Sequence, residues 1–279
     1  MRIKSYVTLP GVFVPVRTAH ALSQELLQIL LAAVVVGLFA LNLPARTLFF
    51  AGDSTLDDHG RKVTSAPHRS WGTELEKSMK PGNRVDNRAA SGRSTRTFVD
   101  EGRWDKLVKD VQPGDFVAVA FGHNDMKCDG KYRDKVYAAA KGAYSDALRR
   151  FVKEVRAKGA TPILMSPIRR GSFGKDGKLV EWKTSCGETL ATYAEAVRAV
   201  AKEQNVEFVD MHELTRQLLE KVGKAESDKF FVISTGWRRS QDGEPEKDVT
   251  HPVQAGAEAF SKLFLDDIRR RNLSVAQLF

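Results

Sequence analysis

A serine, an aspartate and a histidine in this chain have the types and the spacing that nucleophilic catalysis requires. Ser54 follows Gly-Asp directly after the apolar run 48–52, and Asp248 and His251 stand three positions apart near the other end of the chain. At that separation, one turn can present both side chains in the same direction. A catalytic serine needs a histidine to accept its proton and a carboxylate to hold that histidine in the right tautomer. The three residues are therefore a candidate triad.

Ester hydrolysis also needs hydrogen-bond donors aimed at the oxyanion that forms in the transition state. The candidates are the backbone N–H of Ser54, the backbone N–H of Gly92 and the side-chain amide of Asn124. Glycine suits this role because no Cβ blocks the approach of a ligand to its N–H. Asn124 suits it because a neutral amide donates hydrogen bonds without adding a charge beside His251.

These residues are far apart in the sequence, so a fold must bring them together. From residue 46 onward, apolar runs of strand length alternate with stretches of helical period. The runs predicted to be strands are 48–52, 84–87, 116–122, 161–168 and 206–211. Strands that are apolar on both faces and separated by helices indicate a parallel sheet covered on each side. We therefore expect a single doubly wound α/β domain with a five-stranded parallel sheet and helices on both faces.

The helices between these strands are predicted from the period of their apolar residues. The three clearest cover 144–158, 190–201 and 254–270. The first of them ends in a basic residue followed by glycine, which is typical of a helix C-terminus.

The predicted strands also say where a site would form. In open parallel sheets, ligands bind outside the carboxyl ends of the strands. Ser54 directly follows the first predicted strand, Gly92 lies in the loop after the second, and His123, Asn124 and Asp125 follow the third. Three polar loops are therefore expected to converge on one edge of the sheet.

The N-terminal segment is predicted to be separate from this domain. An apolar run of 13 residues, 29–41, suits the central region of a secretory signal better than a membrane-spanning helix. We predict that residues 1–45 are a signal peptide or an N-terminal membrane anchor and that 46–279 form the hydrolase domain. The protein is then expected to be secreted or periplasmic, with a membrane contact only if the leader stays attached. A start codon assigned too far upstream would also explain the long leader.

Composition bounds the remaining possibilities. With 42% apolar and 28% charged residues, the chain is expected to fold around a sizeable core. Its formal charge of +9 indicates either attraction to polyanions or only a solvated basic surface. Its two cysteines, Cys128 and Cys186, form one bridge or remain buried thiols, and they are too few for a zinc site. We expect no cofactor, no metal and no nucleic-acid partner, and we expect a monomer.

The same residues carry a family resemblance. Four sequence blocks resemble, in order, those of the SGNH (GDSL-type) hydrolases: Gly52-Asp53-Ser54, Gly92, Gly122-His123-Asn124-Asp125 and Asp248-x-x-His251. The resemblance implies a flavodoxin-like sheet, in which serine, glycine, asparagine and histidine have the roles assigned above. It runs from residue 48 to about 264.

Within that family, the chain is most similar to the rhamnogalacturonan acetylesterase branch. The most specific part is the stretch SGRSTRTFVDEGRW, residues 91–104. Ser91 stands where the branch often has a second glycine, and residues 236–247 match no motif. The resemblance implies hydrolysis of O-acetyl esters on an extracellular plant cell-wall polysaccharide, without naming the sugar.

Several residues are candidates for contact with such a substrate. The chain has four tryptophans, which either stack on sugar rings or pack in the core. Trp237 is the best sugar-contact candidate, because its loop leads to His251. His123 either contacts substrate or orients the neighbouring amide. Arg93 and Arg96 either hold an acidic sugar or form a salt bridge under their loop.

Two other functions stay open at this stage. A metal-dependent phosphoesterase would use an oxygen-rich set of ligands. That set is Asp53, Asp57, Asp58, Asn124, Asp248 and His251. This alternative leaves the loop around Gly92 unexplained. The other is a carbohydrate-binding protein that keeps the fold without turnover.

Overall fold

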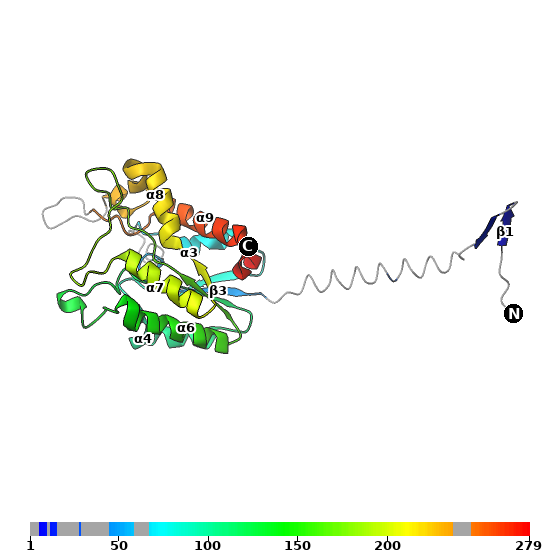
Figure 1. Ribbon diagram of the computed structural model, residues 1–279, viewed down its shortest axis with the longest axis horizontal. Coiled ribbons are helices and arrows are strands. Elements are labelled where there is room, and N and C mark those ends of the chain that lie inside the picture. Colours follow the sequence, from blue (N-terminus) through cyan, green and yellow to red (C-terminus); the bar gives the residue numbers. More distant parts are fainter. Residues whose placement is uncertain (1–5, 10–11, 16–27, 29–44, 59–66, 237–246) are drawn as a thin grey trace. The chain divides into compact units, whose positions relative to one another are not determined.

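The computed structural model describes residues 6–9, 12–15, 28, 45–58, 67–236 and 247–279 (Figure 1). The chain divides into two compact units, Met1–Ala45 and Arg46–Phe279. In the first unit, β1 (Tyr6–Leu9) pairs antiparallel with β2 (Val12–Pro15), a hairpin that the sequence analysis did not predict.

The apolar run 29–41 lies outside the described residues, so the leader remains a prediction. Of the helices in the described ranges, none combines the length and the apolar character needed to cross a lipid bilayer.

The second unit is built on a five-stranded sheet in which every pairing is parallel. Its strands are β3 (Thr47–Gly52), β4 (Arg84–Asn87), β5 (Phe116–Ala120), β6 (Thr161–Met165) and β7 (Glu207–Val209). Their order across the sheet is β4-β3-β5-β6-β7, which is the flavodoxin-like order. The predicted architecture is therefore confirmed.

The last three strands are shorter than predicted, because the apolar runs of β5 and β6 continue into buried loops and that of β7 continues into the start of the helix 211–228. After β5, the carbonyl of Phe121 accepts a hydrogen bond from the Tyr144 hydroxyl at 3.0 Å, so it has a side-chain partner. After β6, Pro167 has no N–H to donate to a neighbouring strand. Apolar composition therefore predicts that these residues are buried, but it does not predict where the pairing between strands ends.

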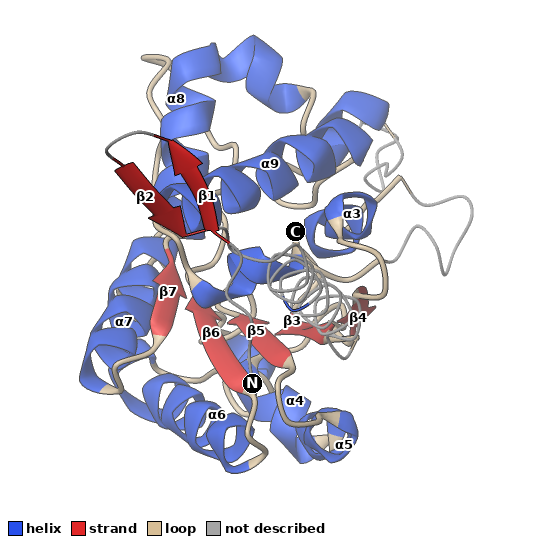
Figure 2. Ribbon diagram, turned by 90° about the vertical axis from the view of Figure 1, so that its right-hand side faces the viewer, coloured by secondary structure: helices blue, strands red, loops and turns tan. Residues whose placement is uncertain are grey.

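The helices cover both faces of the sheet (Figure 2). One face carries α4 (Thr95–Asp100), α5 (Arg103–Asp110), α6 (Ser145–Ala157) and α7 (Leu190–Glu203). The other carries α3 (Trp71–Glu74), α8 (Met211–Asp228) and α9 (Gln254–Arg270). Alternate residues of β3 serve the two cores, with Phe49 in the first and Phe50 in the second.

Two of the four tryptophans belong to these cores. Trp104 is fully buried and stacks on Phe151 with ring centroids 3.9 Å apart. Trp71 is also buried and lies edge-on to Phe50 at 5.9 Å. Both are therefore packing residues, and neither presents a face to a sugar.

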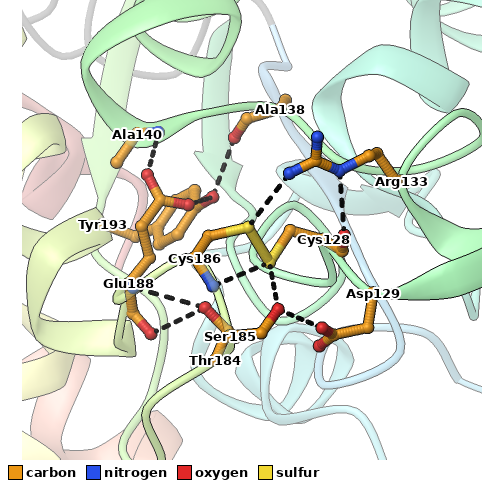
Figure 3. Close-up of a disulfide and its surroundings, with 10 residues drawn as sticks. All are labelled: Cys128, Asp129, Arg133, Ala138, Ala140, Thr184, Ser185, Cys186, Glu188 and Tyr193. Atoms are coloured by element: carbon orange, nitrogen blue, oxygen red, sulfur yellow. Dashed lines mark hydrogen bonds between the residues drawn. A yellow bond between two sulfur atoms is a disulfide. The ribbon is translucent and has the colours of Figure 1, made fainter.

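A disulfide joins Cys128, in the loop after β5, to Cys186, in the loop before α7 (Figure 3). Of the two alternatives for these cysteines, the bridge is the one that the structure contains. Around the bridge, the Arg133 guanidinium donates to the Cys128 carbonyl at 3.2 Å. The bridge therefore fastens the loop that follows Asn124 to the loop that contains Trp182.

Candidate active site

Ser54 lies in a tight turn at the carboxyl end of β3. The carbonyl of Asp53 accepts a hydrogen bond from the N–H of Leu56 at 3.1 Å, which closes the turn. Gly52 ends the strand just before it, where a Cβ would come within 2.9 Å of the Ala120 carbonyl oxygen. Only glycine therefore fits where the chain turns to present Ser54.

The Asp53 side chain ties this turn to the loop after β5. Its carboxylate is buried and accepts hydrogen bonds from the N–H of Thr55 at 3.0 Å, from the Thr55 hydroxyl at 2.9 Å and from the N–H of His123 at 3.3 Å. Burial raises the pKa of Asp53, although these hydrogen bonds act in the opposite direction. Asp53 therefore links two of the loops that form the site.

The three candidate triad residues meet. Nε2 of His251 lies 2.8 Å from Oγ of Ser54, and Nδ1 of His251 lies 2.7 Å from Oδ2 of Asp248. The second carboxylate oxygen of Asp248 accepts from the backbone N–H groups of Thr250 and His251, both at 3.0 Å. Residues that are 197 positions apart along the chain are thus in hydrogen-bond contact.

The charge on Asp248 decides the direction of these hydrogen bonds. Burial alone would raise the pKa of Asp248, but the hydrogen bonds from His251 and Thr250 lower it to about 2. The carboxylate is therefore ionised at neutral pH and accepts the Nδ1 proton of His251. In that tautomer, the lone pair of Nε2 faces the Ser54 hydroxyl.

Backbone contacts hold the Asp248–His251 segment in place. In the short helix η4 (Val232–Thr235), the N–H of Val232 donates to the His251 carbonyl at 3.0 Å, and the N–H of Ile233 donates to the Asp248 carbonyl at 2.9 Å. The His68 ring packs edge-on against the His251 ring, with centroids 5.1 Å apart. Sequence reasoning missed His68, because no motif contains it.

The candidate oxyanion donors open into one cavity with the triad. This cavity has a volume of about 220 Å³, and we call it the Ser54 pocket. Its lining residues are Ser54, His68, Ser91, Gly92, Asn124, Lys127 and His251. Gly92 has φ +80°, a backbone conformation that favours glycine, and no atom lies within 4 Å of the position that its Cβ would take.

Both ends of the Asn124 amide have partners. Its Nδ2 donates one hydrogen bond to the Arg93 carbonyl at 3.0 Å, and its Oδ1 accepts one from Lys127 Nζ at 2.7 Å. A primary amide has two N–H groups, so one remains for a ligand in the Ser54 pocket. Lys127 is a further residue that sequence reasoning missed, since its loop matched no motif.

Asp57 holds the Gly92 loop. Its Oδ2 accepts from the N–H of Ser91 at 2.9 Å and from the Ser91 hydroxyl at 2.7 Å. A glycine at this position would keep the first of these bonds and lose the second. The serine that departs from the family pattern therefore gives its loop an extra attachment.

The predicted substrate contacts are placed differently. His123 is only 3% exposed and is not among the residues that line the Ser54 pocket, so contact with substrate, the first of its two predicted roles, stays a prediction that this burial does not favour. Arg93 takes the salt-bridge alternative, with Nε at 3.1 and 3.0 Å from the carboxylate oxygens of Glu101. Arg96 donates to a backbone carbonyl at 3.3 Å. Trp237 lies outside the described residues.

The ligand set suggested for a metal-dependent phosphoesterase is not gathered around one point. Within the described ranges, one group of three metal-binding side chains has its ligand atoms within 4.8 Å of one another, namely His68, Asp248 and His251. In that group, Asp248 and His251 are hydrogen-bonded to each other. The Asp53 carboxylate is bonded instead to Thr55 and His123.

A larger cavity, of about 530 Å³, is lined by Val249 and Thr250, the two residues between Asp248 and His251. We call it the Trp182 cavity. Its other lining residues are Arg170, Gly171, Ser172, Phe173, Trp182, Lys224, Asp228, Ile233 and Lys247. The segment 249–251 thus borders both the Ser54 pocket and the Trp182 cavity.

Comparison with known proteins agrees with this geometry. Residues 50–259 match the GDSL-like Lipase/Acylhydrolase family. The chain is 31% identical over 226 residues to rhamnogalacturonan acetylesterase RhgT of Bacillus subtilis, which covers 81% of this chain and 90% of that protein. It is 28% identical over 233 residues to the probable rhamnogalacturonan acetylesterase YesY of the same organism, covering 84% of this chain and 97% of that one.

Solved structures show the same fold. Protein YxiM of Bacillus subtilis superposes with a TM-score of 0.65 at 23% identity, over 83% of this chain and 58% of that one. The acetylxylan esterase Axe2 of Geobacillus stearothermophilus does so with a TM-score of 0.57 at 21% identity, over 81% of this chain and 94% of that one. From the family match and the similarity to RhgT, the chain belongs to the GDSL-like lipase/acylhydrolase family of carboxylic ester hydrolases.

Proposed function

We propose that this protein is a serine esterase that removes O-acetyl groups from an extracellular plant cell-wall polysaccharide of the rhamnogalacturonan type. The observation that carries the proposal is the continuous hydrogen-bonded chain from Asp248 through His251 to Ser54, with contacts of 2.7 and 2.8 Å. This order of carboxylate, imidazole and hydroxyl is the arrangement that activates a serine nucleophile.

Acylation follows from this geometry. Ser54 Oγ attacks the acetyl carbonyl carbon while its proton passes to Nε2 of His251. The ionised Asp248 stabilises the imidazolium that forms. The imidazolium then gives the proton to the departing sugar oxygen as the ester bond breaks, which leaves an acetylated Ser54 and a free sugar hydroxyl.

The negative oxygen of the tetrahedral intermediate takes its hydrogen bonds in the Ser54 pocket. We assign the donors to the backbone N–H groups of Ser54 and Gly92 and to the free N–H of Asn124. Lys127 and the Arg93 carbonyl fix the orientation of that amide, so the donor is in place before reaction.

Deacylation repeats these steps with water as the nucleophile. His251 Nε2 takes a proton from water, and the hydroxide adds to the acetyl carbon. The protonated ring returns the proton to Ser54 Oγ as acetate leaves. The triad is then restored, and no redox partner is consumed.

Two relatives support the choice of an acetylated carbohydrate. RhgT is named a rhamnogalacturonan acetylesterase, and YesY a probable rhamnogalacturonan acetylesterase. The Ser54 pocket, at about 220 Å³, is small enough to favour a short acyl group over a long one.

The test is acetate release from acetylated rhamnogalacturonan, acetylated pectin, acetylated xylan and an aryl acetate. We expect hydrolysis of the aryl ester, which reports the chemistry, and the highest kcat/KM on rhamnogalacturonan. Hydrolysis that needs added metal after treatment with a chelator would overturn the triad mechanism. A preference for acetylated xylan would overturn the substrate and leave the chemistry standing.

A further inference from the structure

Trp182 is an exposed aromatic side chain held in a fixed position. It is 68% exposed, the highest value among the large apolar side chains in the described part of the chain. One face of its ring is covered by the Arg170 guanidinium, whose Cζ lies 5.0 Å from the ring centroid. The opposite face is turned to solvent and is available to stack on a flat apolar surface, such as the face of a sugar ring.

The residue before Trp182 is anchored in the same way. Glu181 forms an ion pair with the buried Arg169 and accepts a hydrogen bond from Nε2 of His212 at 3.1 Å. Arg169 therefore contacts Glu181, and the next residue, Arg170, contacts Trp182. The Arg170 contact with the ring and the Glu181 ion pair thus orient Trp182 before a ligand binds.

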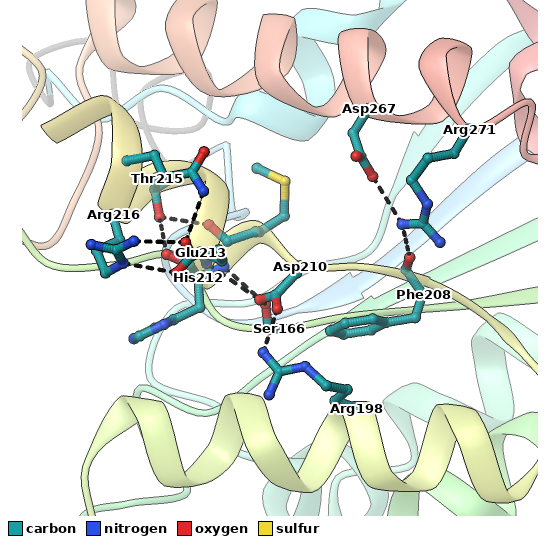
Figure 4. Close-up of polar contacts among 12 residues, drawn as sticks. Ser166, Arg198, Phe208, Asp210, His212, Glu213, Thr215, Arg216, Asp267 and Arg271 are labelled. Atoms are coloured by element: carbon teal, nitrogen blue, oxygen red, sulfur yellow. Dashed lines mark hydrogen bonds and ion pairs between the residues drawn. The ribbon is translucent and has the colours of Figure 1, made fainter. Parts of the chain in front are cut away.

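The start of α8 holds His212 itself (Figure 4). The N–H of His212 donates to the Ser166 hydroxyl at 2.8 Å, and that hydroxyl donates to Asp210 at 2.8 Å. This network joins the end of β6 to the first turn of α8. The contacts that hold Glu181, the residue before Trp182, are therefore attached to the sheet through the end of β6.

The Trp182 cavity has more positive than negative side chains. Lys224 is paired with Asp228 at 2.5 Å. Arg170 and Lys247 also line the cavity, and among the described residues neither has an acidic side chain within ion-pair distance. Within the part of the chain that the structure describes, Lys247 thus lies in the same cavity as Trp182 without an ion-pair partner, while the more distant carboxylates of Asp53 and Asp248 attract Arg170.

We propose that the Trp182 cavity is a subsite for a sugar that carries a carboxylate, a uronate residue near the acetylated sugar in the polymer. Its ring stacks on the open face of Trp182, and its carboxylate binds Lys247, while Arg170 stays on the covered face of the indole. Arg93 and Arg96, for which the sequence left an acidic sugar or a salt bridge open, are not among the residues that line this cavity. This inference deepens the proposed function and rests on it, because it makes the substrate of the same enzyme an acidic polysaccharide.

The test measures binding without turnover, by calorimetry on the full-length S54A variant. The probes are trigalacturonate and its trimethyl ester, which have the same sugars and differ in charge. We expect trigalacturonate to bind about tenfold more tightly, a typical effect of a charge-assisted contact. Trp182→Ala is expected to weaken both probes, and Lys247→Gln only the charged one. Equal binding of the two probes to the S54A variant would overturn the subsite.

Lys178→Gln is the matched control, since it removes one exposed lysine charge without touching the cavity. We expect it to bind trigalacturonate as the S54A parent does. If it weakens binding as much as Lys247→Gln, then general surface charge and not a subsite explains the result. Neither probe carries an acetyl ester, so this outcome is independent of hydrolysis. Failure to cleave any acetyl ester would instead count against the proposed function.

Discussion

The Ser54 pocket and the Trp182 cavity share the Asp248–His251 segment, yet they are built by different means. Most residues that line the pocket follow strand ends, while His68 and His251 precede α3 and α9, and short hydrogen bonds such as Asn124 to Arg93 hold its parts together. The cavity is lined by long loops and by the end of α8, and ion pairs hold it from outside, as Glu181 does with Arg169. Under the proposed function and subsite, the two regions would divide the roles, so that the sheet positions the chemistry and the loops select the polymer.

The largest expected effect tests whether the Ser54 pocket is the place of reaction. Ser54→Ala and His251→Ala are each expected to lower kcat on the aryl acetate by at least about 10³-fold, because triad members act as a unit. The measurement is initial rates, with thermal unfolding to check that each variant folds. The double variant should be no slower than either single one by more than a few-fold. Retention of a tenth of wild-type activity in Ser54→Ala would disprove the assignment.

A smaller effect is expected from the oxyanion donor. Asn124→Ala is expected to lower kcat by about 10²- to 10³-fold with little change in KM, because its hydrogen bond forms in the transition state. The same factor should be found on the aryl ester and on the polymer, since both place an oxyanion in the Ser54 pocket. A loss of activity on the polymer alone would show that Asn124 contributes to polymer binding and not to oxyanion stabilisation.

Lys127 lines the Ser54 pocket and contacts Asn124, so its substitution tests how much that contact supports catalysis. Lys127→Met removes the contact to Asn124 Oδ1 and frees the amide to rotate, so we expect kcat to fall about tenfold, as for loss of one charge-assisted hydrogen bond. Lys135→Met is the control, because Lys135 is an exposed lysine in the same loop and does not line the pocket. Equal losses in the two variants would show that loop charge matters and the contact does not.

The smallest expected effect is on the free energy of unfolding, through Asp125, which follows Asn124 in the sequence. Asp125 is fully buried, and its Oδ1 accepts from the N–H and the hydroxyl of Thr95 at 2.9 and 2.6 Å. Burial raises the pKa of Asp125 from 3.8 to about 7. Because the folded pKa lies above the unfolded one, ionisation of this group opposes folding. The penalty is absent below about pH 4 and complete above about pH 7.

Asp125→Asn keeps an acceptor for Thr95 and cannot ionise. We expect its free energy of unfolding to match wild type near pH 4 and to exceed it near pH 8, by about 1 kcal/mol or more. Urea titrations at the two pH values measure this. A difference that does not change with pH would contradict the assignment. The result would also show that a buried residue next to Asn124 in the sequence lowers the stability of the fold, a pattern common at functional sites.

The part of the molecule that sequence predicts is the part set by short-range patterns. Alternating buried residues in β3 place Phe49 and Phe50 in opposite cores, so an apolar run predicts a strand covered on both faces. The separation of Asp248 and His251 predicts that their side chains meet. Strand ends then predict the edge where Ser54 and its partners gather.

The rest depends on contacts between distant positions. Lys127 is the exception, since it lies only three positions from Asn124, in a turn closed by its own N–H to the Asn124 carbonyl at 3.0 Å, but no sequence motif indicates that its side chain contacts the amide. The role of Trp182 depends on Arg170, a residue in another loop. His123 fits the pattern of a polar residue at a strand end, yet its side chain is buried, and this burial lowers its pKa well below the usual range. Residue type alone does not distinguish these cases.

The Cys128–Cys186 bond closes a covalent ring, with 58 positions between its ends, that contains Arg169, Arg170 and Trp182. Closing a ring of that length limits the freedom of the unfolded chain, which corresponds to about 4 kcal/mol in the chain-entropy description. A preparation made in a reducing cytoplasm would lack this contribution, and the loop that follows Asn124 would no longer be joined to the loop that contains Trp182. Quantifying free thiols in each batch of recombinant enzyme should therefore precede any comparison of specificity between laboratories.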